Sequence, residues 1–101
     1  IANAGFGELA LSGVTVDGNR AEADGGGIWN DGVLSVRDSA LRDNQTEKGL
    51  FGGGGAIWNA ATGTLRLSAT LCQANAARGG RADVFNNGGT VTNETPCAVA
   101  G

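Results

Sequence analysis

Short stretches in which every second residue is apolar recur along the chain, at 9–11, 34–36 and 65–67. A period of two is typical of β-strands that bury one face, whereas a helix repeats its apolar residues every three or four positions. Glycine runs at 25–27 and 52–55 lie between these stretches and would break a helix there. The pattern therefore predicts short strands joined by glycine- and asparagine-rich corners.

A longer motif repeats on top of this alternation. The segment GGGIWN at 25–30 returns as GGAIWN at 54–59, and 80–86 is a weaker copy. One series of asparagines marks these copies at intervals of 27, 29 and 27 residues: Asn3, Asn30, Asn59 and Asn86. A second series comes ten residues after the first leucine of each strand: Asn19, Asn44 and Asn75. Repeats of this length indicate a solenoid, in which each coil packs on the next.

A repeat of 25 to 31 residues has room for three short strands and three corners, which make one coil of a parallel β-helix. Successive coils lie about 4.8 Å apart, so equivalent residues stack in columns. Stacked asparagines can bond through their side-chain amides, and stacked aromatic rings would form a candidate contact column of Trp29, Trp58 and Phe85. We therefore predict one all-β domain, 1–101, of about four coils, near 1–24, 25–51, 52–79 and 80–101.

Composition narrows the partners and cofactors that the chain can use. The 101 residues include no histidine and carry a net charge of −3. An acidic chain without a basic stripe is a poor partner for nucleic acid or for an anionic membrane surface. Its apolar runs are only a few residues long, so we expect no insertion into a membrane. Two cysteines without histidine do not complete a zinc site, and we expect no metal and no cofactor.

The acidic residues do not gather into a predicted active site. Aligning the coils places Asp38 and Asp43 level with glycines of the first coil and alanines of the third. Polysaccharide-cleaving sites need several carboxylates on one face, and the one polar column here is mixed: Asp17, Arg42 and Gln73. We therefore predict no catalytic residues and no enzyme.

The outward positions of the alternating strands also do not form an ordered threonine face of the ice-binding type. Two arginines interrupt these positions, which are Ala10, Ser12, Ser35, Arg37, Arg66 and Ser68. We expect this face to be an ordinary solvated surface of the solenoid.

The two cysteines allow one disulfide bond. Cys72 comes seven residues after Leu65 and Cys97 six residues after Val91, which places both at nearly the same register in adjacent coils. The coil spacing of about 4.8 Å brings such residues within bridging reach. A bond would stabilise the last coil by roughly 3 kcal/mol and would imply an oxidising compartment. Two unpaired, merely apolar cysteines are the alternative.

Short motifs give the chain a resemblance to known repeats. The segment 54–57 is GGAI and 25–28 is GGGI, while 16–19, 41–44 and 72–75 each end in asparagine three residues after an apolar residue or cysteine. In these features the chain resembles the polymorphic outer-membrane protein repeats and related bacterial surface β-helix repeats. The resemblance implies a right-handed parallel β-helix at the surface of a bacterial cell or outside it, often with an adhesive role.

The ends of the predicted solenoid suggest what it does. Neither end shows an amphipathic capping helix, so we expect two open ends that carry unpaired strand edges. Such ends favour an extracellular structural subunit that assembles end to end, as a homo-oligomer or fibre. An adhesin-type module, or a fragment of a larger surface protein, that binds glycan or host protein through outward-facing tryptophans is the alternative. A polysaccharide-acting enzyme is the third candidate.

Overall fold

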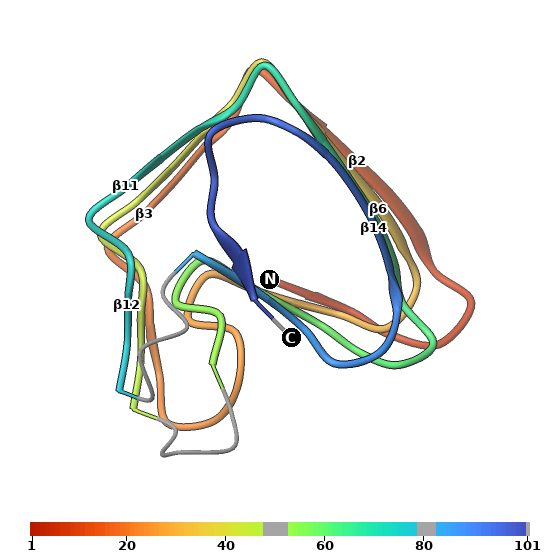
Figure 1. The fold of residues 1–101 in the computed structure, drawn as a ribbon, viewed down its shortest axis with the longest axis horizontal. Helices are drawn as coiled ribbons and strands as arrows, with labels where there is room; N and C mark the ends of the chain where they lie inside the picture. The colour runs from red at the N-terminus through yellow and green to blue at the C-terminus, as the bar shows by residue number, and fades with distance from the viewer. Residues whose placement is uncertain (48–52, 79–82, 101) are drawn as a thin grey trace.

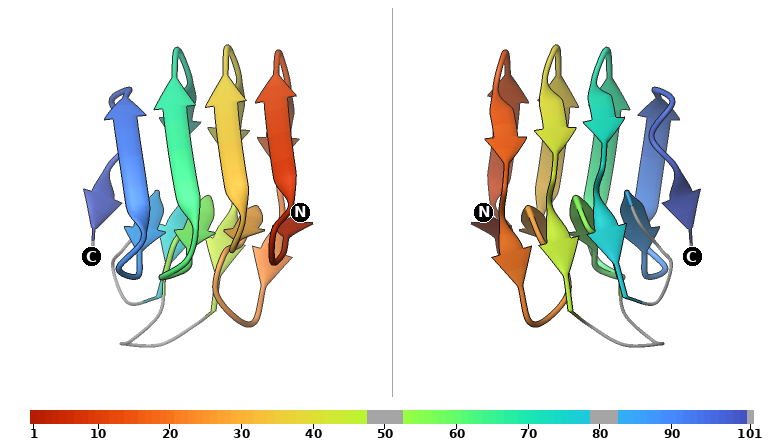
Figure 2. Two further views of the ribbon diagram at one scale, coloured as in Figure 1. Left: turned by 90° about the vertical axis from the view of Figure 1, so that its right-hand side faces the viewer. Right: turned by 90° about the vertical axis from the view of Figure 1, so that its left-hand side faces the viewer.

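The chain winds into a right-handed parallel β-solenoid (Figures 1 and 2). The computed structural model describes residues 1–47, 53–78 and 83–100, and every regular element in these ranges is a β-strand. All pairs of neighbouring strands are parallel. The predicted fold class, an all-β right-handed parallel β-helix, is confirmed.

Each complete coil contains four strands. The first has β1 (Ala2–Asn3), β2 (Glu8–Ser12), β3 (Thr15–Asp17) and β4 (Arg20–Ala21). The second has β5 (Ile28–Asn30), β6 (Val33–Arg37), β7 (Ala40–Arg42) and β8 (Gln45–Thr46). The third has β9 (Ile57–Asn59), β10 (Thr64–Ser68), β11 (Leu71–Gln73) and β12 (Ala76–Ala77). Three further strands follow: β13 (Val84–Asn86), β14 (Thr90–Glu94) and β15 (Val99–Ala100).

Equivalent strands of successive coils form four sheets, which we call A to D. Sheet A has the order β1-β5-β9-β13-β15 and sheet B the order β14-β10-β6-β2. Sheet C is β11-β7-β3 and sheet D is β12-β8-β4. The described strands thus make three complete coils and an incomplete fourth, close to the four predicted. The prediction of three strands per coil is wrong because sheet D consists of two-residue strands, which are too short to leave an alternating pattern in the sequence.

The alternating apolar residues build the core in the predicted register. In sheet B the inward side chains form two columns: Leu9, Leu34 and Leu65, and Leu11, Val36 and Leu67. In the second and third coils these side chains are at most 1% exposed. Their equivalents in β2 are only partly buried, because no described strand lies on the outer side of β2. Burial of each such side chain contributes about 1.5–3 kcal/mol to folding.

The C-terminal segment crosses the end of the core and does not complete the fourth coil. After β14 the chain turns inward and pairs β15 with β13, inside the outline of the other coils (Figure 1). Cys97 in this segment is buried, Asn93 donates a hydrogen bond to its carbonyl at 2.9 Å, and the amide of Ala98 donates to Asp83 at 2.9 Å. The prediction of two open ends therefore holds only in part at this end. The extended segment covers some of the core without any helix, while β11, β12 and β14 have no partner on their outer side in the described residues.

Two corners of the coils require a left-handed backbone at the same position in every coil. One of them is formed by Gly18, Asp43 and Ala74, with φ of +67°, +52° and +54°. The register of sheet C places these three residues level with one another, directly after the column Asp17, Arg42 and Gln73. Only glycine adopts this conformation without a steric cost, so the second and third coils carry strain that the first does not.

We predict that Ala74→Gly raises the free energy of unfolding by about 0.5–1 kcal/mol. The left-handed backbone destabilises an alanine by about 1–2 kcal/mol, and glycine removes this strain. Part of the stabilisation is offset because glycine also makes the unfolded chain more flexible. Urea denaturation measures the change. Gly18→Ala, at the same corner, is the reverse test: no atom lies within 4 Å of the added Cβ, so a loss of similar size would come from the backbone alone. Stabilisation by Gly18→Ala would contradict the explanation.

Candidate functional site

A continuous ladder of asparagine side chains runs along the corner between sheets A and B. The Nδ2 of Asn3 donates to the Oδ1 of Asn30 at 2.9 Å, Asn30 donates to Asn59 at 2.8 Å, and Asn59 donates to Asn86 at 3.0 Å. Asn30 and Asn59 are fully buried. The first three amides also donate to backbone carbonyls of their own coil and the next, as Asn30 does to Gly32 and Thr64, and Asn86 donates to Gly89 of its own coil. The structure thus brings together all four residues of the first predicted series.

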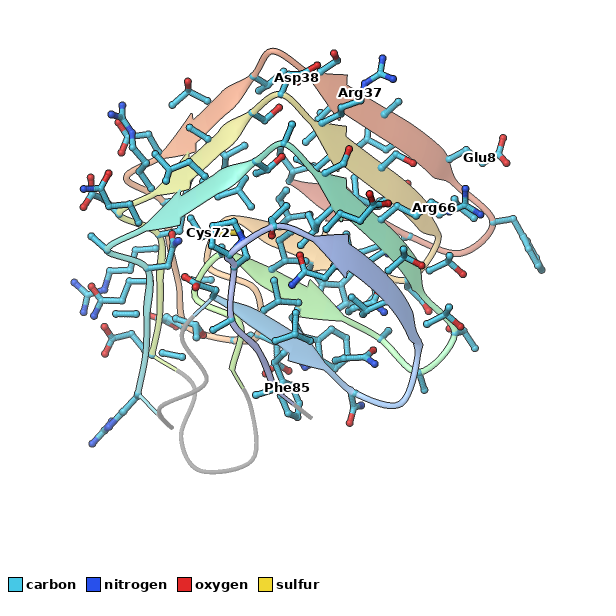
Figure 3. The ribbon with its side chains drawn as sticks, turned by 45° about the horizontal axis from the view of Figure 1, so that its top comes forward. Glu8, Arg37, Asp38, Arg66, Cys72 and Phe85 are labelled. Atoms are coloured by element: carbon cyan, nitrogen blue, oxygen red, sulfur yellow. A yellow bond between two sulfur atoms is a disulfide. The ribbon has the colours of Figure 1, made fainter. Side chains whose placement is uncertain are left out.

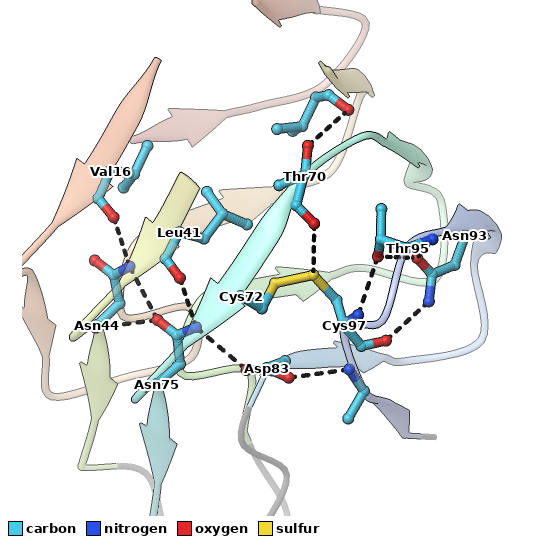
Figure 4. The surroundings of a disulfide bond; sticks show 12 residues. Val16, Leu41, Asn44, Thr70, Cys72, Asn75, Asp83, Asn93, Thr95 and Cys97 are labelled. Atoms are coloured by element: carbon cyan, nitrogen blue, oxygen red, sulfur yellow. Dashed lines mark hydrogen bonds between the residues drawn. A yellow bond between two sulfur atoms is a disulfide. The ribbon is translucent and has the colours of Figure 1, made fainter. Parts of the chain in front are cut away.

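The second asparagine series forms a shorter ladder that ends on a carboxylate. Asn19 donates to Asn44 at 3.0 Å and Asn44 donates to Asn75 at 3.1 Å. Asn75 in turn donates to Asp83 at 3.2 Å (Figure 4). Asp83 also accepts the amide of Ala98, so it joins the ladder to the C-terminal segment. No sequence signal marks Asp83 for this role, because the equivalent residues of the earlier coils are Gly27 and Ala56, which have no side-chain acceptor.

The aromatic column stacks within the protein and leaves little ring face free. Trp29 and Trp58 point away from the core, with ring centroids 5.7 Å apart and planes inclined by 12°. Ala2 and Phe85 lie next to them in the same register, one on each side. A sugar ring that stacks on an indole needs a free face, and here the faces are turned along the solenoid toward one another. The column therefore stabilises sheet A and is a poor ligand platform.

The predicted disulfide bond between Cys72 and Cys97 is confirmed (Figure 4). It joins β11 to the segment that crosses the end of the core, and the two Cα atoms are 5.3 Å apart. Together with the hydrogen bonds of Asn93 and Asp83, the bond fixes this segment at both flanks of Cys97.

The surface feature best suited to a ligand is a shallow groove of about 640 Å³ on the outward face of sheet B. Its lining includes the six outward positions named from the sequence, and β14 adds Thr92 and Glu94. The other lining residues, Leu11, Val36 and Leu67, carry side chains that belong to the core. We call this feature the sheet B groove. The sequence identified its positions but not the concave shape, which comes from the stacking of four strands.

The two arginines of the sheet B groove project from its floor (Figure 3). Arg37 lies 3.9 Å from the carboxylate of Asp38, with both side chains more than 60% exposed, so this contact is weak. Arg66 makes no ion pair with any residue in the described ranges. Arginine presents a planar fork of donors that matches a carboxylate, so an unpaired arginine in a groove is suited to an anionic ligand.

Two further ion pairs lie on other faces of the solenoid. Arg42 lies 3.5 Å from Asp17, in register with Gln73, which makes the polar column expected from the sequence. Arg20 lies 2.8 Å from Glu47 on sheet D. Among residues 1–47, 53–78 and 83–100 no three metal-ligating side chains gather into a cluster. The same ranges contain no helix of a length and apolarity that would cross a membrane.

We predict that Asn30→Asp lowers the free energy of unfolding by about 3 kcal/mol. The substitution keeps the shape of the side chain but replaces the donor Nδ2 with an oxygen that faces the Oδ1 of Asn59, in a fully buried position. The same change at the ladder end, Asn86→Asp, keeps the acceptor used by Asn59 and should cost about 1 kcal/mol. Equal losses in chemical denaturation would show that the ladder does not stabilise the core in this way.

We also predict that replacing both cysteines with alanine lowers stability by roughly 3 kcal/mol, because the bond closes a loop across a sequence separation of 25 residues. Hydrogen exchange should show that protection is lost first around 95–100, since the bond holds this segment against the core. The parent protein should contain no free thiol in the native state. Titration of two thiols there, or exchange that accelerates equally in all sheets, would contradict the assigned role.

Comparisons with known proteins found no relative of this chain. No protein-family model, no curated protein and no solved structure matches the chain. The resemblance to the polymorphic outer-membrane protein repeats therefore rests on the short motifs alone, and any function is argued from the ends and surfaces of the solenoid.

Proposed function

We propose that the protein is an extracellular structural β-solenoid that associates with a second copy of itself through the edge formed by β2, β3 and β4. The observation that carries this proposal is the uncovered edge of the first coil. In the described residues these three strands have no partner on their outer side, and the inward side chains of β2 are only partly buried. At the other end the disulfide-bonded segment covers part of the core and β15 pairs with β13, while β11, β12 and β14 are edge strands there among the described residues.

The strand counts of the sheets argue against a continuous head-to-tail stack. All four sheets begin in the first coil, but they end with five strands in sheet A, four in sheet B and three in each of sheets C and D. A coaxial copy whose β1 paired with β15 would leave an empty strand position between its β2 and β14. Unfilled positions of this kind leave backbone groups unpaired. The open fibre expected from two equivalent ends is therefore less favoured than a closed pair of copies.

The exposed edge of β2 is complementary to itself. The carbonyl of Gly7 and the amide of Gly13 form hydrogen bonds with β6. Because the direction of these groups alternates along a strand, the N–H and C=O groups of Glu8, Ala10 and Ser12 point to the opposite, outer side of β2. Antiparallel pairing of two β2 strands about Ala10 would place Glu8 opposite Ser12 and Leu9 opposite Leu11. No like charges meet, and the apolar side chains of both copies fall on the same, inward face. Such an isologous contact closes as a dimer.

Two features support a location outside the cytosol. A disulfide bond between residues far apart in sequence is typical of oxidising compartments. The motif resemblance also favours a bacterial cell surface. A polysaccharide-cleaving enzyme has less support, because no three acidic side chains of the described residues gather into a cluster, and Asp17, Asp38 and Glu47 each lie beside an arginine.

We predict that the 101-residue chain forms dimers whose fraction rises with protein concentration in analytical ultracentrifugation. Single-cysteine variants then locate the contact. Ala10→Cys on β2 and Thr92→Cys on β14 occupy one outward column of sheet B, at its two opposite edges. Paired strands place opposite Cα atoms about 4.5–5.5 Å apart, within reach of a disulfide bond. Ala10→Cys alone should therefore give a covalent dimer on mild oxidation.

The matched control separates the modes of association. Thr92→Cys alone should stay monomeric on a non-reducing gel, and a mixture of the two variants should give no heterodimer. Heterodimers would show a head-to-tail contact and overturn the closed pair. A parent chain that sediments as a monomer at every concentration would overturn self-association itself.

A further inference from the structure

We propose that the sheet B groove binds a polysaccharide that carries carboxylate groups. This site is independent of the proposed association, because it lies on the outward face of the sheet and its arginines belong to the two central strands, β6 and β10.

The two arginines are placed for a chain of anionic groups rather than for a single one. Arg66 pairs in register with Ser35, and Arg37 lies two residues farther along the same strand as Ser35. One coil spacing and two strand residues separate the two arginines, so their Cα atoms lie roughly 8 Å apart. At this separation each guanidinium group has room for its own carboxylate, with two parallel N–H···O bonds to each. An extended polymer with a carboxylate on successive units matches this arrangement.

The rest of the lining favours sugar units over peptide side chains. Hydroxyl groups of Ser12, Ser35, Ser68 and Thr92 surround the arginines, and each is both a donor and an acceptor for sugar hydroxyls. Ala10 is the only apolar side chain among the outward lining positions, so the groove has no pocket for an apolar peptide anchor. The backbone groups of the two central strands are used within the sheet, so a peptide cannot add as a strand beside the two arginines.

The charge of the groove contrasts with that of the whole chain. Its lining has two guanidinium groups and one carboxylate, that of Glu94 on β14, whereas the net charge of the protein is −3. The net charge of the protein disfavours an anionic polymer in general, whereas Arg37 and Arg66 attract it locally. The carboxylate of Asp38 competes for Arg37 only weakly, given its distance and exposure. Arg66 shares the groove with the carboxylate of Glu94 but makes no ion pair in the described residues, so it should contribute most to binding.

The test is a titration of ¹⁵N-labelled protein with a trimer of galacturonic acid, with the uncharged trimer of galactose as the matched ligand. We expect amide shifts confined to β2, β6, β10 and β14 for the acidic trimer only, and an affinity that falls as salt is added. Arg66→Gln should weaken binding about tenfold or more, and Arg37→Gln somewhat less. Both side chains project into solvent, so the fold should be unaffected, and the spectrum without ligand verifies this.

Control variants and control ligands distinguish binding at the sheet B groove from nonspecific electrostatic attraction. Arg78→Gln removes one exposed arginine outside the groove and should leave the affinity unchanged. An equal loss in Arg78→Gln, or equal binding of the uncharged trimer, would overturn the assignment of the arginines. A glutamate tripeptide that binds as tightly as the acidic trimer would overturn the choice of a polysaccharide. Absence of any shift at millimolar acidic trimer would overturn the site altogether.

Discussion

The hydrogen bonds between buried asparagine amides are the interaction on which the stacking of the coils depends. Each amide is satisfied by the equivalent asparagine one coil away and by backbone carbonyls beside it, so no coil can meet its own hydrogen-bonding needs alone. Among the described residues no buried side-chain nitrogen or oxygen lacks a partner. Because an unpaired buried amide is costly, a shift of register between coils would break the ladder at every step, whereas apolar packing tolerates small displacements. The ladders therefore fix the register, and the leucine and valine columns supply most of the burial.

The hydrogen-bond ladders terminate differently at the two ends of the chain. Asp83 accepts the last amide of the second ladder and also holds the C-terminal segment, while the disulfide bond secures that segment against β11. Polar satisfaction and core coverage are thus achieved by the same few residues. On the outer side of β2 the backbone groups have no described partner and no segment of the described chain crosses the core, so this edge is available for further pairing.

The outward face of sheet B follows from the same stacking. Parallel in-register strands place every second residue of four coils on one surface, so that serines, a threonine and two arginines scattered over more than eighty residues of sequence become neighbours. The tryptophans show the opposite consequence. Stacking in one column satisfies their ring faces internally, so a column that is attractive as a ligand platform in the sequence becomes part of the scaffold.

The sequence by itself determined the repeat, the parallel β-solenoid, the inward columns and the register of the cysteines, because each coil must present the same residue types at the same positions to stack. It did not reveal the strands of sheet D, which are too short to show an alternating pattern. It also did not reveal the left-handed backbone of Asp43 and Ala74, because neither residue type predicts that conformation. Only the tertiary structure decided that the C-terminal segment crosses the core and that Asp83 ends a ladder, because both depend on contacts outside the repeat. The groove on the outward face of sheet B likewise forms only when side chains of four coils come together.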